Sequence, residues 1–288
     1  MLQANSAAVK SASGTQVANR RRVRLAIGIL LLATAAAGQQ YGSPWRPEYE
    51  DEKNGPHGEC KVEWRHVSSG LDYRHIDCLG DRDDLDLHVV RVDQKFCRLD
   101  VAVVPGGGAA RRVADDKNAG FVINTNFFDH RRSPLGVLVR SGDEVQRAKS
   151  TSWQSIFLID ADGLPQIIDP GDWPKYRKFA WLAVQAGPRL VTAGHTARVH
   201  QSYSAERAGV CINKRNELLF FATPRDRKFD MYEIARIARR GEIDGGLECR
   251  DAMLFDGGHS TQIYLEGGRT QVSVAGDDVP AFIYAVKR

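Results

Sequence analysis

The 288-residue sequence has few of the features that would support a metal cluster, a cofactor fold or a membrane-spanning helix. It contains five cysteines, and none of them forms a CxxC pair or a Cys/His spacing typical of zinc. The apolar run Leu25–Ala37 holds only 13 residues, which is too short to cross a bilayer comfortably as a helix. The sequence therefore predicts no metal and no cofactor.

Acidic residues are absent from the first 37 residues, which contain five of the 40 Lys and Arg residues. The remaining chain has 35 basic and 36 acidic residues, so the formal charge of +4 comes from this N-terminal segment. The rest of the chain shows no basic face interleaved with aromatic residues, as a nucleic-acid-binding surface would. We therefore expect no nucleic-acid partner.

The N-terminal segment has the order of an export signal. Polar residues come first, the basic stretch "RRRVR" follows, and the apolar run ends with Ala35 and Ala37 in a small-x-small pattern. This predicts a signal peptide over residues 1–37, cleaved near Ala37, with an uncleaved N-terminal membrane anchor through residues 25–37 as the alternative. Either way, the folded part is expected to be exported, periplasmic or secreted, and to contact a membrane only through this segment.

All the cysteines lie beyond residue 37, where disulfides can persist after export. Cys60–Cys78 and Cys211–Cys249 are plausible local pairs, which would leave Cys97 free. Sequence alone does not fix this connectivity.

Residues 38–60 are rich in Pro, Gly and charge and lack periodicity, so they predict a linker. From Lys61 onward, short strand-like runs recur, among them "DLHVVRVD", "CRLDVAVVP", "GFVINTNFF", "GVLVR", "SIFLID", "GVCI", "ELLFFAT", "AMLFD", "QIYLEGG" and "FIYAVKR". Only Ala109–Asn118 and Met231–Arg240 favour helices, the second ended by Gly241 as a C-cap. We expect one mixed α+β domain over residues 61–288, with extensive β-sheet and few helices.

The stretch "AMLFDGGHSTQIYLEGG" interrupts two strands with polar groups and glycines. Asp256 stands at the exit of the first strand, where its carboxylate can be held in a fixed direction. Gly257 and Gly258 allow a sharp turn and a close approach to a ligand. His259, Ser260 and Thr261 add a titratable ring and two hydroxyls. A glycine-rich hairpin with an Asp-mediated turn is the structural alternative.

Two further stretches carry unusual polar residues. "VINTNFFDHRRSPLG" places Asn124 and Asn126 on one face of a strand end, followed by Asp129. Asparagine is a poor strand former, and its amide suits sugar hydroxyls or phosphate oxygens, although turns also favour Asn and Asp. "AVQAGPRLV" places Gln185 before a Gly-Pro turn, and "AERAGVCI" places Arg207 before a strand, where it can grip a phosphate.

Together these stretches resemble the phosphodiester glycosidase family. "INTNFFD" with the following "PLG" resembles its Asn-Gly-Gly-Phe-Phe segment, and "QAGPRLV" is similar to its Gln-x-Gly-Pro-x-Leu segment. "ERAGV" and "LFDGGHSTQIYL" resemble its Arg-x-Ala-x-Gly-like strand start and its Asp-Gly-Gly-Gly-Ser-Thr segment, in the family's order. The resemblance carries over the following candidate residues: Asn124, Asp129, Gln185, Arg207, Asp256, Gly257, Gly258, Ser260 and Thr261.

The sequence departs from the family pattern at two places. Thr125 and Asn126 stand where the family commonly has Gly-Gly, and His259 replaces a glycine beside Ser260. Both departures add bulk at the expected pocket, so they bear on the identity of the substrate and on activity.

The resemblance implies hydrolysis of a sugar-1-phosphodiester between the anomeric carbon and the phosphate oxygen. Ordinary glycosidases use two carboxylates, one of which protonates a poor leaving group. A phosphate monoester leaves more easily, so positive charge on the phosphate and one carboxylate near the anomeric carbon are the main needs. We assign Arg207 to the phosphate and Asp256 to the anomeric centre, as nucleophile or as base for water, with Asp129 as the reserve carboxylate. The amides of Gly257 and Gly258 are expected to bind a phosphate or sugar oxygen, and the remaining substrate-binding candidates are Asn124, Asn126, Gln185, His259, Ser260 and Thr261.

Two alternatives stay open at this stage. One is a metal-dependent phosphodiesterase with Asp256, His259, Asp129 and His130 as ligands, whose residue types suit Zn²⁺ or Mn²⁺ although their spacing matches no metal motif. The other is an exported glycan- or envelope-binding domain without turnover. If the protein is a phosphodiester glycosidase, its partner is a sugar-phosphate or glycan-phosphodiester substrate.

Overall fold

The computed structural model describes residues 60–61, 63–78, 85–198 and 203–288. The predicted signal peptide or anchor, and all but the last residue of the predicted linker, lie outside the described residues. The described residues belong to one compact unit, Gly42–Arg288. Among them, no helix is both long enough and apolar enough to cross a membrane.

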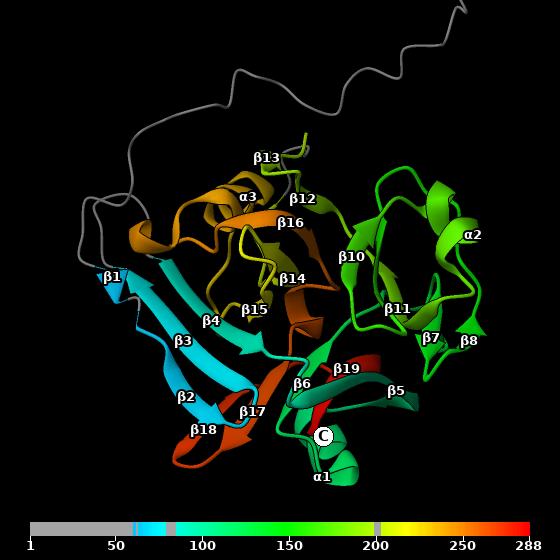
Figure 1. The fold of residues 1–288 in the computed structure, drawn as a ribbon, viewed down its shortest axis with the longest axis horizontal. Coiled ribbons are helices and arrows are strands. Elements are labelled where there is room, and N and C mark those ends of the chain that lie inside the picture. The colour runs from blue at the N-terminus through cyan, green and yellow to red at the C-terminus, as the bar shows by residue number, and fades with distance from the viewer. Residues whose placement is uncertain (1–59, 62, 79–84, 199–202) are drawn as a thin grey trace, which may run out of the picture. The chain divides into compact units, whose positions relative to one another are not determined.

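Nineteen strands of the described residues form three sheets (Figure 1). The nine-stranded sheet has the order β1 (Cys60–Lys61), β3 (Leu71–Cys78), β4 (Leu85–Val92), β15 (Leu218–Ala222), β14 (Ala208–Asn213), β16 (Cys249–Leu254), β12 (Arg189–Thr192) and β13 (His195–Thr196), with β2 (Arg65–Ser68) paired to β3. The β9–β11 sheet has the order β10 (Pro165–Ile168), β9 (Ser155–Asp160), β11 (Ala180–Ala186), β7 (Leu138–Arg140) and β8 (Asp143–Gln146). The β6–β19 sheet has the order β18 (Thr270–Val274), β17 (Ile263–Gly267), β6 (Phe121–Asn124), β19 (Val279–Lys287) and β5 (Cys97–Gly108).

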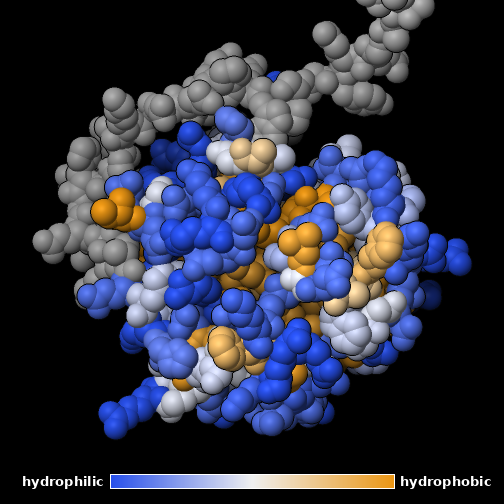
Figure 2. Space-filling model, viewed as in Figure 1, coloured by the Kyte–Doolittle hydropathy of each residue, from blue (hydrophilic) through white to orange (hydrophobic). Residues whose placement is uncertain are grey.

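Each sheet contributes one face to a shared central core. In β15, Leu218, Phe220 and Ala222 face this core, whereas Leu219 and Phe221 face a second cluster on the other side of the sheet. Because successive side chains point to opposite faces of a strand, a strand buried on both faces reads as a continuous apolar run. This explains the run "LLFFA" in β15. On the surface, by contrast, hydrophilic residues cover most of the described part drawn in Figure 2.

Three α-helices occur in the described residues, each in the cluster on the outer face of a different sheet (Figure 1). α1 (Ala110–Lys117) packs on the β6–β19 sheet and α3 (Met231–Arg239) on the nine-stranded sheet. The third, α2 (Trp173–Tyr176), follows the 3₁₀ turn η2 (Pro170–Asp172) and packs on the β9–β11 sheet.

The α+β prediction of extensive sheet with few helices is confirmed, as are both predicted helices to within a residue at each end. α3 begins at a capping box in which the Asp230 side chain accepts hydrogen bonds from the backbone of Tyr232 and Glu233. The predicted C-cap at Gly241 is wrong, because Gly241 has φ −60° and begins the next turn, η3 (Glu242–Asp244), instead of adopting the left-handed conformation of a cap.

The structure shows the state of the cysteines whose side chains it describes. Cys211 and Cys249 form a disulfide, and Cys97 is free and buried, both as predicted. Cys78 is also disulfide-bonded, and its backbone pairs with that of Cys60 in the β1–β3 ladder. The side chain of Cys60 lies outside the described part.

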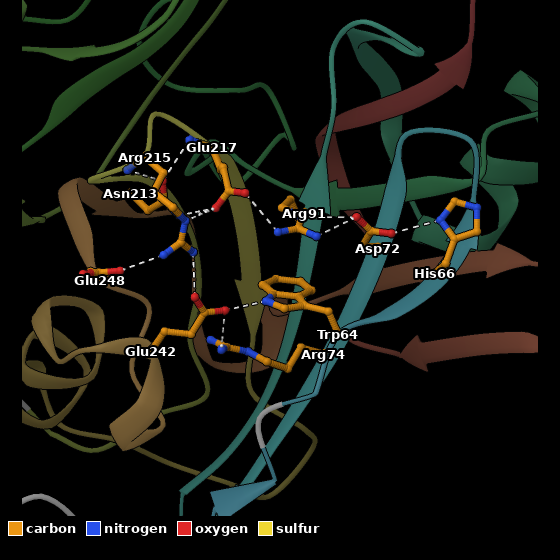
Figure 3. A network of polar contacts seen from close by, with 10 residues as sticks. All are labelled: Trp64, His66, Asp72, Arg74, Arg91, Asn213, Arg215, Glu217, Glu242 and Glu248. Carbon is orange, nitrogen blue, oxygen red and sulfur yellow. Dashed lines mark hydrogen bonds and ion pairs between the residues drawn. The ribbon is translucent and has the colours of Figure 1, made fainter.

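A polar network braces one end of the nine-stranded sheet, where β14 turns into β15 (Figure 3). The fully buried guanidinium of Arg74 donates to the Glu242 carboxylate at 3.0 Å and to the Gly246 carbonyl at 2.7 Å. Arg74 and Arg91 lie 4.9 Å and 4.5 Å from the ring of Trp64, within cation–π distance. The network lies at the end of the sheet opposite to the one where β14 begins and β16 ends.

Candidate active site

The candidate site lies where the nine-stranded and β6–β19 sheets meet end to end. Phe255 N–H donates to the Ala208 carbonyl at 2.8 Å, which continues the pairing of β16 with β14 beyond the last ladder pair, Gly209 with Leu254. One residue further, Asp256 N–H donates to the Thr125 carbonyl, also at 2.8 Å, just past the end of β6. The backbone of Asp256 is therefore fixed by both sheets.

The Asp256 carboxyl is mostly buried. Burial raises its pKa from 3.8 to about 6, while hydrogen bonds from the Ser260 hydroxyl and the Gly257 N–H lower it. A carboxyl of this kind changes protonation state close to neutral pH, as a catalytic acid, base or nucleophile does. Of the predicted site residues, Asp256 has the environment that best suits a catalytic group.

The two glycines after Asp256 occupy backbone positions that a larger residue would not fit or would adopt only with strain. A Cβ on Gly257 would lie 2.8 Å from the Glu206 carbonyl oxygen, so only glycine fits there, and Gly258 has φ +61°. Gly258 N–H donates to that same carbonyl at 2.8 Å, and Gly257 N–H is directed to the Asp256 carboxyl. Both amides therefore have partners within the chain, and their binding of a substrate oxygen stays a prediction.

Arg207 lies opposite Asp256 if the β14–β16 register is continued by two residues beyond its last ladder pair. Its Nε donates to the Phe229 carbonyl and its Nη2 to the Tyr203 carbonyl, both at 2.9 Å. Burial lowers the pKa of its guanidinium, and Tyr203 and Asp230 are the largest opposing influences. The structure thus brings the segments of Asp256 and Arg207 together, as predicted, and two backbone carbonyl groups orient the guanidinium.

Asn124 and Asn126 are both buried and both bond to backbone. Asn124 Nδ2 donates to the Asp256 carbonyl at 2.7 Å, and its Oδ1 accepts from Gln262 N–H at 2.9 Å. Asn126 Nδ2 donates to the Leu135 and Val137 carbonyls at 3.0 and 3.1 Å. Asn124 therefore ties β6 to both ends of the Asp256–Gln262 loop, and Asn126 fixes the segment that leads into β7.

Gln185, on β11, is fully buried and has hydrogen-bond partners on both amide atoms. Its Oε1 accepts from Val137 N–H and Lys149 N–H, each at 2.9 Å. Its Nε2 donates to the Lys149 carbonyl at 2.5 Å and to Gln154 Oε1 at 3.2 Å. Gln185 consequently clamps the loop between β8 and β9 onto the sheet.

The remaining predicted residues differ in exposure. Asp129 caps its own loop by accepting from Arg131 and Ser133 N–H, each at 2.9 Å, and the Ser133 bond is the main cause that lowers the pKa of its carboxyl. His259 is exposed, and its Nδ1 lies 3.9 Å from the Asp277 carboxylate. Thr261 is buried, and its hydroxyl has no hydrogen-bond partner among the described residues.

Two residues of the region were missed by the sequence analysis. Gln262 accepts from Ala110 N–H at 2.8 Å and donates to the Asp277 carbonyl at 2.7 Å, so it joins the start of α1 to the β18–β19 loop. Its position directly after Thr261 was the available signal. Trp153 is half exposed, and its ring centroid lies 5.3 Å from that of Phe127, which follows Asn126. An isolated tryptophan within the polar stretch "KSTSWQS" was the corresponding signal.

The described residues contain no group of three or more His, Cys, Asp or Glu side chains arranged to hold a metal ion. Asp256, His259, Asp129 and His130, considered above as ligands, therefore do not form such a group.

The comparisons with known proteins agree with the motifs. A family model described as phosphodiester glycosidase matches residues 117–285, which is more than half of the chain and includes every site segment described above. A comparison with curated proteins gave no match.

Solved structures with the same fold include the catalytic domain of zebrafish N-acetylglucosamine-1-phosphodiester alpha-N-acetylglucosaminidase. The TM-score is 0.58 at 15% identity, covering 80% of this chain and 88% of the zebrafish domain. A hypothetical protein from Synechocystis gives a TM-score of 0.57 at 14% identity, covering 79% of this chain, and the match spans 64% of that protein's length. At these identities the likeness shows the fold.

Proposed function

Because the chain belongs to the phosphodiester glycosidase family, we propose that it hydrolyses a sugar-1-phosphodiester at the bond between the anomeric carbon and the phosphate oxygen. The zebrafish relative is named for an N-acetylglucosamine-1-phosphodiester, and we propose a substrate of that kind, with an α-linked sugar. The observation that carries the proposal is the partly buried Asp256 carboxyl, with a pKa of about 6, at the strand end that the family motifs surround.

Asp256 acts in this proposal as the carboxylate at the anomeric carbon, either as nucleophile or as base for water. Its desolvation raises the energy of the charged form, so the carboxylate gains from bonding to an electron-poor carbon or from taking a proton. Gly257 N–H and the Ser260 hydroxyl hold the carboxylate in one direction. Because the leaving group is a phosphate monoester, no second carboxylate has to protonate it strongly, which agrees with Asp129 being occupied as a loop cap.

Arg207 supplies positive charge beside the departing phosphate. Two of its hydrogen bonds go to the carbonyl groups of Phe229 and Tyr203, and these bonds orient the guanidinium. An arginine has five N–H donors in a rigid fork, so a guanidinium oriented in this way can still stabilise a developing phosphate charge.

The side-chain amides of the family motifs bond to other parts of the chain. Asn124, Asn126 and Gln185 hold the loops around Asp256 through their bonds to backbone and to Gln154, so we propose that they position the site. His259 is exposed beside the same loop, and we propose that it, with Ser260 and Thr261, lies next to the bound substrate.

We also propose that the chain is exported. The disulfide between Cys211 and Cys249 suits an oxidising compartment, and residues 1–37 have the order of a signal peptide. Mass spectrometry of the protein recovered from the periplasm or medium tests this, since cleavage near Ala37 gives a new N-terminus. Recovery of the protein only from the cytoplasm would contradict export.

The experiment that tests the activity is a screen of the protein lacking residues 1–37 on α-linked sugar-1-phosphodiesters in isotopically labelled water. Cleavage of the glycosidic C–O bond places the labelled oxygen on the sugar, whereas a metal-dependent phosphodiesterase would place it on the phosphate. Saturable sugar-phosphate binding without product would instead support the non-catalytic alternative. Asp256→Asn and Arg207→Ala should each remove most of the turnover, and near-normal turnover in both would contradict the assigned roles.

A further inference from the structure

Trp153 is a large aromatic side chain that is held in place and yet left half exposed. It lies in the loop between β8 and β9, its residue exposure is 51%, and its ring meets that of Phe127 edge-on. The loop is fixed by the hydrogen bonds that Gln185 accepts from Lys149 N–H and donates to the Lys149 carbonyl and to Gln154 Oε1. The exposure of Trp153 is therefore a property of an ordered loop, at the cost of leaving apolar surface in water.

Two independent routes of contact connect Trp153 to Asp256, the candidate nucleophile or base. On one side, Asp256 N–H donates to the Thr125 carbonyl, and Phe127, two residues later, carries the ring that contacts Trp153. On the other side, Leu254 N–H donates to the Pro188 carbonyl at 2.9 Å, next to Gly187.

The second route is completed by a close contact at Gly187. A Cβ on this residue would lie 2.8 Å from the Trp153 carbonyl oxygen, so the backbone of Trp153 passes directly against it. Trp153 is thus placed beside the end of β16, which leads into Asp256, from two directions.

The strand order then separates Trp153 from Arg207. β16 pairs with β14, which leads back to Arg207, on one side, and with β12, which leads back to Gly187 and Pro188, on the other. Asp256, at the end of β16, therefore stands between a guanidinium on one flank and an exposed aromatic ring on the other.

We propose that Trp153, supported by Phe127, is the platform on which the sugar ring of the substrate stacks. This inference rests on the proposed function, because Asp256 must face the anomeric carbon for the two flanks to receive the two halves of a glycosyl phosphodiester. With the phosphate on the Arg207 flank, the glycosyl ring extends to the Trp153 flank. The C–H groups on one face of a pyranose are apolar, and an indole ring binds such a face while excluding water from it.

The test uses the methyl diester of α-N-acetylglucosamine-1-phosphate as substrate. This probe carries only a methyl group beyond the phosphate, so an effect of Trp153 on it reports the sugar and not the alcohol. We compare wild-type protein with Trp153→Ala, with Trp153→Phe, which keeps an aromatic ring, and with Phe96→Ala. Phe96 is a matched control because its residue exposure is 53%, against 51% for Trp153, and it lies in the turn between β4 and β5.

We expect Trp153→Ala to lower kcat/KM by roughly tenfold or more, mainly through KM. The kcat/KM of Trp153→Phe should stay within about threefold of the wild-type value. The kcat/KM of Phe96→Ala should equal the wild-type value. Equal kcat/KM for wild type and Trp153→Ala would overturn the platform while leaving the proposed function intact.

A binding measurement separates the two hypotheses if the wild-type protein does not cleave the diester. The diester is titrated into wild-type and Trp153→Phe protein, and tryptophan fluorescence is followed. A saturable change that is absent from Trp153→Phe supports the platform even though the proposed activity has failed. No change in the wild-type protein, or an equal change in both, overturns it.

Discussion

Replacing Asp256 by asparagine should stabilise the protein at neutral pH while removing its activity. Burial raises the pKa of this carboxyl from 3.8 to about 6, so the folded protein binds the proton more tightly than the unfolded chain does. Between pH 3.8 and about pH 6, the free energy of unfolding falls as the pH rises, because the folded protein holds a proton that the unfolded chain has lost. Above about pH 6 the carboxylate is charged in both states, and the folded protein bears the full free-energy cost of keeping that charge partly buried. A difference of 2.2 pKa units corresponds to a cost of about 3 kcal/mol.

Asparagine is neutral at every pH, so the variant avoids this cost. It also loses one of the oxygens that can accept from Ser260 and Gly257, which costs about 1 kcal/mol. At about pH 7.5 we therefore expect a net gain of about 2 kcal/mol, which is a rise in Tm of roughly 4–8 °C for a domain of this size. At about pH 4.5 the cost in the wild-type protein is only about 1 kcal/mol, so the two Tm values should coincide.

Calorimetry or fluorimetry at pH 4.5, 6.0 and 7.5 measures this difference, and turnover is assayed on the same samples. Asp129→Asn is the matched control. Its carboxyl is exposed, and backbone N–H groups of its own loop lower the pKa, so the substitution should bring no gain in stability as the pH rises. A Tm difference for Asp256→Asn that is independent of pH, or a loss of stability at pH 7.5, would refute the reasoning.

Three further results are expected. The kcat/KM of the wild-type protein should rise with pH through a midpoint of about 6. Ser260→Ala should move this midpoint to higher pH, because the Ser260 hydroxyl lowers the pKa of the Asp256 carboxyl. A midpoint at lower pH in Ser260→Ala would contradict the assignment. Gly257→Ala should lower both Tm and activity because its Cβ would lie 2.8 Å from a carbonyl oxygen, whereas Gly171→Ala, with no atom within 4 Å, should leave both unchanged. Reduction of the Cys211–Cys249 disulfide, which joins residues 38 positions apart, should lower the free energy of unfolding by up to about 4 kcal/mol, and an unchanged Tm in reductant would contradict this.

Much of the fold follows from the sequence, because long apolar runs bounded by turn residues predict strands wherever both faces of a sheet are buried. All ten strand-like runs named in the sequence analysis overlap strands of the structure, and both predicted helices are present. The ten runs do not include β3 and β11, which have eight and seven residues. Several short elements were missed for a physical reason. β12, β13 and α2 have four residues or fewer, so they depend on partners far away in the sequence and carry little periodicity of their own.

The site was predicted in part. The sequence indicated that the segments of Asp256 and Arg207 converge, and the β14–β16 register brings them together. It did not show Trp153, because an exposed tryptophan in a polar loop gains its meaning only when strand order places that loop beside the end of β16. Nor did it show which backbone amides are free, since Gly257 and Gly258 resemble an anion-binding turn until the position of the Glu206 carbonyl is known.

The polar motif residues illustrate a general difficulty at the ends of sheets. Where β6 and β16 end and β14 begins, backbone N–H and C=O groups lose their ladder partners, and buried groups of this kind must be paired. Asn124 satisfies groups on both sides of the Asp256–Gln262 loop, and Gln185 does the same for the loop that carries Trp153. These amides lie at or next to the last residue of a strand for the same reason that a ligand site lies there, so sequence alone cannot separate the two roles. Substituting Asn124 or Gln185 should therefore lower stability together with activity, whereas Trp153→Ala should lower kcat/KM alone.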